Sequence, residues 1–96
     1  MIYEWDPRKA AANMRKHGVS FEEAASVFLD RAALTFQDPD HSEVEERAIT
    51  IGRSTRQRIV FVAHTEREDR LRIISARRAT RQETKQYEER IDEAAP

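Results

Sequence analysis

Three runs of strand-forming residues follow one another in the second half of the chain, separated only by short charged turns. The first run alternates polar and apolar residues and turns Ile49 and Ile51 inward, as in a strand with one buried face. The middle run, Arg58 to His64, is apolar on both faces and is therefore predicted to be the central strand. Strands joined by short turns pair antiparallel. The three runs, residues 47–52, 58–64 and 70–76, therefore predict an antiparallel sheet.

Two helix signals precede these strands. Asp6 and Pro7 are the residue types favoured at an N-cap and at the first helical position, and Gly18 follows a basic turn as a helix terminator. Ser20–Glu23 is a capping box, and the apolar residues after Ser20 recur at helical spacing. Two consecutive helices are predicted, over residues 7–17 and 21–29.

A second capping box, Thr80–Glu83, opens a C-terminal helix that is predicted to continue through Ile91. Two further short strands are predicted at residues 2–5 and 34–36. The order β-α-α-β-β-β-β-α indicates an α+β domain. The length of 96 residues suits one modest core, so we expect a single domain over residues 1–92 and a frayed tail at 93–96.

Charge is unevenly spread along the chain, although the net charge is only -1. The zone from Arg53 to Arg81 holds nine arginines and three acidic residues, and 14 of the 17 basic residues are arginine. The forked arginine side chain matches the geometry of phosphate oxygens. This asymmetry indicates an anionic partner, and the alternative is a solvated face with local ion pairs.

Several classes of protein are disfavoured by missing residues. The absence of cysteine excludes thiolate metal sites and thiol nucleophiles. The three histidines lack the spacing of a zinc helix, and two glycines cannot build a phosphate-binding loop. No cofactor or metal is therefore expected. The sequence has no apolar run of about 18 residues and no signal-peptide pattern, so we expect a cytoplasmic protein without a membrane partner.

The strand-borne arginines suit metal-free RNA cleavage. That reaction needs a general base for the 2′-hydroxyl, a general acid for the leaving oxygen and cations for the charge on phosphorus. Glu46, His17, His64 or Tyr87 could transfer protons. Three of these four also have a structural interpretation: His17 at a helix C-terminus, His64 at the end of a buried strand and Tyr87 in helix packing.

A set of short motifs runs through nearly the whole chain, in order from residue 3 to about residue 90. They are Tyr3–Ala10, Asn13, Lys16–Ala24, Glu46-Arg47, Ile51-Gly52, Arg72–Thr80, Glu83 and Tyr87. Any one of these segments would be a weak signal, but their combination is specific. On these residues the sequence resembles the BrnT toxins, and no motif position departs from the family pattern.

The resemblance implies a toxin of a bacterial type II toxin–antitoxin system. It implies a RelE-like fold, a small antiparallel sheet flanked by helices, and a ribonuclease that blocks translation. The implied partner is a BrnA-like antitoxin that binds DNA, so the toxin would meet DNA only through that complex. A homodimer and a toxin–antitoxin heterotetramer both remain open.

Under this interpretation the arginines bind the phosphates of the RNA backbone. The catalytic candidates are Glu46, Arg47, Arg72, Arg77 and Arg78, followed by His17 and Tyr87. The candidates for RNA binding are Lys16, Arg53, Arg70 and Arg81.

A non-catalytic role is the main alternative. A degenerate toxin would act as a protein-binding module and co-repressor, with the acidic residues 38–46 or a helix face docking a basic antitoxin segment. Direct DNA binding is disfavoured, because no helix-turn-helix pattern is recognisable and the net charge is -1.

Overall fold

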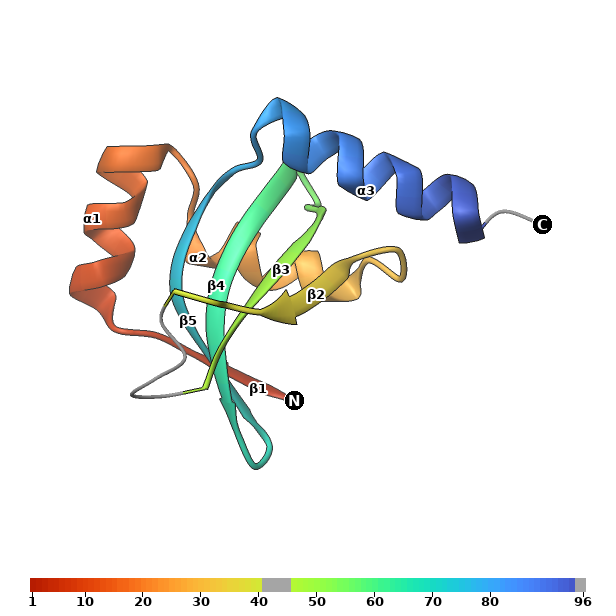
Figure 1. The fold of residues 1–96 in the computed structure, drawn as a ribbon. Coiled ribbons are helices and arrows are strands. Elements are labelled where there is room, and N and C mark those ends of the chain that lie inside the picture. The colour runs from red at the N-terminus through yellow and green to blue at the C-terminus, as the bar shows by residue number, and fades with distance from the viewer. Residues whose placement is uncertain (41–45, 95–96) are drawn as a thin grey trace.

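The computed structural model describes residues 1–40 and 46–94. Figure 1 shows a sheet with helices on both sides of it. In chain order the elements are β1 (Ile2–Glu4), α1 (Pro7–His17), α2 (Phe21–Ser26), the 3-10 helix η1 (Val27–Leu29), β2 (Leu34–Gln37), β3 (Arg47–Arg53), β4 (Ile59–Arg67), β5 (Arg70–Arg78) and α3 (Arg81–Ala94).

The sheet has five strands in the order β1-β5-β4-β3-β2. Strands β2 to β5 pair antiparallel with their sequence neighbours, which confirms the predicted antiparallel arrangement and the α+β class. Strand β1 pairs parallel with β5 at the far edge, which the element order alone did not reveal. The crossover through α1 and α2 is long enough to carry the chain from one edge of the sheet to the other.

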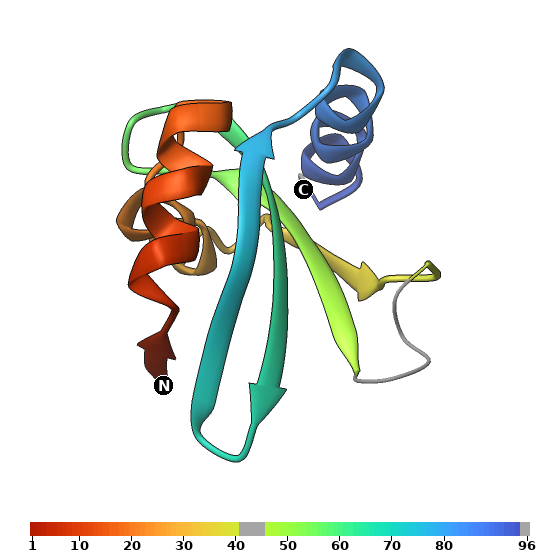
Figure 2. The same cartoon turned by 90° about the vertical axis from the view of Figure 1, so that its left-hand side faces the viewer.

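Two apolar clusters lie on opposite faces of this sheet, as Figure 2 shows through the placement of α1 and α2 on one side and α3 on the other. The larger cluster packs Val19, Phe21 and Ala24 against β4 and β5. The smaller one packs Tyr87 of α3 against Ile49 and Ile51 of β3. Helix α3 covers only one end of its face, and no other helix of the described residues lies over the rest, which we call the open face (Figure 1).

Several boundaries differ from the predicted ones. The second helix ends at Ser26 and tightens into a 3-10 turn over Val27–Leu29. The last helix runs to Ala94, beyond the predicted Ile91 and into the expected tail, whose last two residues lie outside the described part of the chain. Of the acidic residues 38–46, those at 41–45 also lie outside the described part of the chain.

Asn13 ties α1 to the edge of β5 beyond the reach of β1. Its side-chain amide donates to the Ala76 carbonyl (2.8 Å) and accepts from the Ala76 N–H (3.1 Å), as a neighbouring strand would. The same amide donates to the Val19 carbonyl (2.9 Å). One buried side chain therefore closes the strand edge and fixes the loop after α1.

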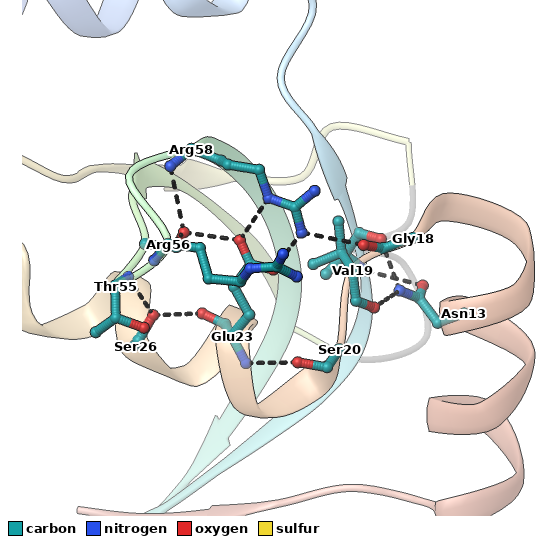
Figure 3. A network of polar contacts seen from close by, with 11 residues as sticks. Asn13, Gly18, Val19, Ser20, Glu23, Ser26, Thr55, Arg56 and Arg58 are labelled. Atoms are coloured by element: carbon teal, nitrogen blue, oxygen red, sulfur yellow. Dashed lines mark hydrogen bonds and ion pairs between the residues drawn. The ribbon is translucent and has the colours of Figure 1, made fainter.

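A buried ion pair fastens α2 to the turn between β3 and β4 (Figure 3). Glu23 is 4% exposed and binds the Arg58 guanidinium through both carboxylate oxygens. Ser54 donates to the same carboxylate (2.7 Å), and Arg58 also donates to the Gly18 carbonyl (3.0 Å). Hydrogen bonds from Arg58, aided by Ser54, outweigh burial and lower the pKa of Glu23.

Gly52 allows β3 to pass close under η1. A Cβ at this position would lie 2.8 Å from Val27 Cγ1 and 2.9 Å from Ala33 Cβ. No larger residue fits there without a shift in the backbone.

Among residues 1–40 and 46–94, no helix combines the length and the apolar character that a membrane crossing requires.

Candidate nucleic-acid interface

The open face of the sheet carries a row of polar side chains across four strands. Arg47 pairs with Thr65, Thr65 pairs with Arg72, and Arg72 pairs with Glu4 of β1. Neighbouring strands lie about 4.8 Å apart, so the two arginines are separated by about 10 Å at the backbone. The register therefore brings together Arg47 and Arg72, which lie 25 positions apart in the sequence.

A basic cavity of about 280 Å³ lies at this row. Its lining includes Arg67, Arg70 and Arg72 with Thr65 and Glu4. The ion pair between Arg70 and Glu4 is exposed, with an N–O distance of 3.3 Å, so it is weak and a phosphate can compete with Glu4 for Arg70. The Arg72 side chain is exposed and has no hydrogen bond or ion pair with any described residue. The cavity therefore presents arginine groups that can bind phosphate oxygens.

A second cavity of about 330 Å³ continues along the same face. The next row of the sheet, Ile49–Ala63–Ser75, forms its floor. Asp38, Asp40 and Arg47 also line it. Asp38 is buried and its carboxylate accepts the Asp40 N–H (3.0 Å), whereas Asp40 is exposed. The face thus combines guanidinium groups with the carboxylates of Asp38 and Asp40, which the sequence indicated only as part of an acidic docking patch.

Arg77 lies on the same face, but its guanidinium forms an ion pair with Glu83 of α3. The guanidinium carbon is 3.9 Å from the centroid of the Phe61 ring, and two nitrogens bind Glu83 at 2.8 and 3.0 Å. Burial favours a raised pKa for Glu83, but bonds from Arg77 and the Thr80 backbone outweigh it and lower that pKa. An alanine at Arg77 would therefore disturb the β5–α3 junction as well as remove a cation from this face.

Tyr87 and Arg53 lie away from the arginine row. Tyr87 is 2% exposed, and its hydroxyl donates to Asp30 Oδ2 (2.6 Å). Burial and the Asp30 carboxylate both raise the pKa of this phenol. Arg53 lies 6.0 Å from the Tyr87 ring centroid, and its backbone N–H also binds Asp30. These contacts anchor α3 to β3, as the packing interpretation of Tyr87 expects, and leave its hydroxyl occupied.

Glu46 lines a different hollow, of about 380 Å³, whose lining also includes Arg47, His64 and Glu66. His64 is 1% exposed, and its Nε2 lies 2.8 Å from the Thr50 hydroxyl, which bonds in turn to Thr35. Its Nδ1 has no hydrogen-bond partner among the described residues. Burial lowers the pKa of this imidazole to about 4, so His64 is neutral at neutral pH.

His64 should make the free energy of unfolding depend on pH. Its pKa falls from 6.5 to about 4 on folding. Between these values the unfolded chain binds more protons, so stability rises with pH by about 3 kcal/mol in total. Urea unfolding at several pH values should show this contribution in the wild type and its loss in His64→Gln. Equal pH slopes for the two proteins would contradict it.

The remaining candidates lie at the borders of the sheet. Lys16 and His17 line a groove of about 220 Å³ between α1 and β5. Arg78 and Arg81 are exposed at the junction of β5 and α3. Within the described residues, no group of three or more His, Asp or Glu side chains is placed to hold a metal ion.

The sequence missed Thr65, Arg67, Ser75 and the Asp38–Asp40 pair as parts of this face. The alternation of β5 places Arg70 and Arg72 on one face, but only the register with β4 adds Thr65 and Arg67 to them. A β-bulge beside His64 shifts that register, so strand alternation alone could not have identified these partners.

Comparison with known proteins agrees with this architecture. The family model described as "Ribonuclease toxin, BrnT, of type II toxin-antitoxin system" matches residues 5–83. The crystal structure of the Brucella abortus ribonuclease toxin BrnT superposes with a TM-score of 0.64 at 25% sequence identity, covering 84% of this chain and 100% of that one. No curated protein matched the chain in sequence. The chain therefore belongs to the BrnT family of ribonuclease toxins from type II toxin–antitoxin systems.

Proposed function

We propose that this toxin is an endoribonuclease that cleaves RNA without a metal ion on the open face of its sheet. The observation that carries this proposal is the convergence of Arg47, Arg70 and Arg72 on one hollowed face, with Arg72 exposed and unpaired among the described residues. Membership of a ribonuclease toxin family supports RNA as the substrate.

The proposed reaction uses the substrate's own 2′-hydroxyl as nucleophile. The 2′-oxygen bonds to the adjacent phosphorus and loses its proton to a base, while the bond from phosphorus to the 5′-oxygen breaks and that oxygen takes up a proton. The products are a 2′,3′-cyclic phosphate and a 5′-hydroxyl. Arg72 and Arg47 would stabilise the negative charge that builds on the phosphoryl oxygens. Asp40, the exposed carboxylate of this face, is our candidate for the base.

We also propose a BrnA-like antitoxin as the protein partner. A toxin of a type II system has an antitoxin partner, and the family membership supports that much. In this proposal the toxin stays in the cytoplasm and reaches DNA only through the antitoxin, as part of a complex that represses their operon.

Expression without the antitoxin tests the proposed function. We expect growth arrest together with new, discrete RNA ends in primer-extension maps. Purified toxin should cleave RNA equally well with and without EDTA, because the proposed chemistry uses no metal. Normal growth with soluble protein and intact RNA would contradict the proposal and favour the co-repressor role.

A further inference from the structure

Helix α1 is basic at both ends, and only the basic residues in its last turn stabilise the helix. The segment Pro7–His17 contains four lysines and arginines and no acidic residue, although the first fifty residues of the chain are acidic in sum. Lys16 lies in the last turn, where a cation is favourable. Lys9 lies in the first turn, where the helix dipole disfavours a cation.

Both lysines line the groove of about 220 Å³ between α1 and β5. They are seven positions apart, which places them about 10 Å apart along the helix axis. Both are exposed, and neither has an ion-pair partner among the described residues. Within the described chain, the lining of this groove includes no carboxylate. The positive charge of the groove is therefore not neutralised by any described carboxylate in its lining.

The groove joins the proposed cleavage face at Ser75. This residue lines both the cavity that holds Arg47 and the groove that holds Lys16. The junction is open because β1 pairs with β5 only at Arg70–Arg72, and the Asn13 amide rather than another strand closes the edge at Ala76. An RNA chain that crosses β5 at Ser75 would therefore meet no further β-strand of the sheet.

We infer that the groove between α1 and β5 is a second RNA-backbone site, in which Lys9 and Lys16 bind phosphates of the strand beyond the cleaved bond. The inference rests on the proposed function, because it extends the RNA path from the cleavage face. Lysine suits this position, since contacts to phosphate without base recognition require charge more than shape.

A non-cleavable RNA separates this inference from the cleavage chemistry. Binding of a long 2′-O-methyl RNA and of a short one, trimmed to the nucleotides that flank the cleaved bond, would be measured for wild type and for Lys9→Gln/Lys16→Gln. Lys85→Gln on the exposed surface of α3 removes the third lysine of the chain and is the matched control.

The double variant should bind the long RNA roughly fivefold to thirtyfold more weakly, with the short RNA and the control unaffected. Its plot of log affinity against log salt should be shallower by about 1.4, because each lost phosphate contact on a single strand contributes about 0.7. Unchanged binding of the long RNA, or equal weakening for both RNAs, would overturn the inference. A wild type that binds both RNAs but cleaves neither natural counterpart would refute the proposed function alone.

Discussion

Replacing Arg72 with alanine is expected to lower the catalytic efficiency of RNA cleavage by about 10²–10³-fold, the effect of removing one donor to a developing anion. Arg72 lies between Thr65 and Glu4 in the row that crosses the open face. Its side chain is exposed and makes no hydrogen bond or ion pair with the described residues, so the fold loses little when it is removed. The rate of cleavage of a defined RNA under kcat/KM conditions measures this effect.

Two further variants make the Arg72 result specific. Arg72→Lys retains the charge but loses the forked geometry, so it should recover only part of the activity. Arg90→Ala removes another exposed arginine, which lies on α3 outside the two cavities of the open face, and this variant should cleave like the wild type. A folded Arg72→Ala toxin that still arrests growth at wild-type levels would remove Arg72 from the proposed site.

Replacing Arg58 with alanine should destabilise the fold by about 3–5 kcal/mol, the cost of leaving a buried charge without its partner. Glu23 would then lie buried with a hydrogen bond from Ser54 and without a hydrogen-bonded cation, because Arg56 acts on its carboxylate only through its charge. For a domain of this size the melting temperature should fall by about 12 °C or more. Thermal unfolding followed by circular dichroism measures the loss.

The free energy of unfolding should also depend on pH through Glu23, which gives a second measurement for the Arg58→Ala variant. Because folding lowers the pKa of Glu23, its contribution to stability is present above about pH 4.5 and is lost as the pH falls through the folded-state value. Arg58→Ala should therefore weaken the acid sensitivity of the fold as well as its stability. Arg31→Ala, an exposed arginine in the turn after η1, should change neither property. A stable Arg58→Ala protein would mean that water or another group compensates Glu23.

The helix boundaries followed from local chemistry that operates within a few residues. Asp6 caps α1 through the Arg8 N–H, and Gly18 ends it with a φ of 69°. Ser20 and Thr80 accept the N–H groups that their capping boxes predict. Because these bonds join residues at most four apart, the residues themselves specify them.

The roles of single ionisable residues did not follow in the same way. Glu23 matched one half of a capping box, yet its side chain turns inward to Arg58, 35 positions further along the chain. Arg77 was indistinguishable from Arg72 as a strand-borne arginine, but only Arg77 finds Glu83 and Phe61 beside it. A charged side chain binds whichever partner the fold brings near it, and local sequence does not contain that partner.

The sequence by itself determined the elements, their antiparallel succession and the family resemblance, because strand periodicity, helix capping and motif order are properties of neighbouring residues. Only the tertiary structure decided which arginines share a face. Strand register and the bulge beside His64 place Arg47, Thr65 and Arg72 in one row. Strand β1 pairs with only three residues of β5, and this leaves the edge of β5 beside α1 free to form the groove. Both depend on long-range backbone pairing, whose register is set by the packing of the whole sheet.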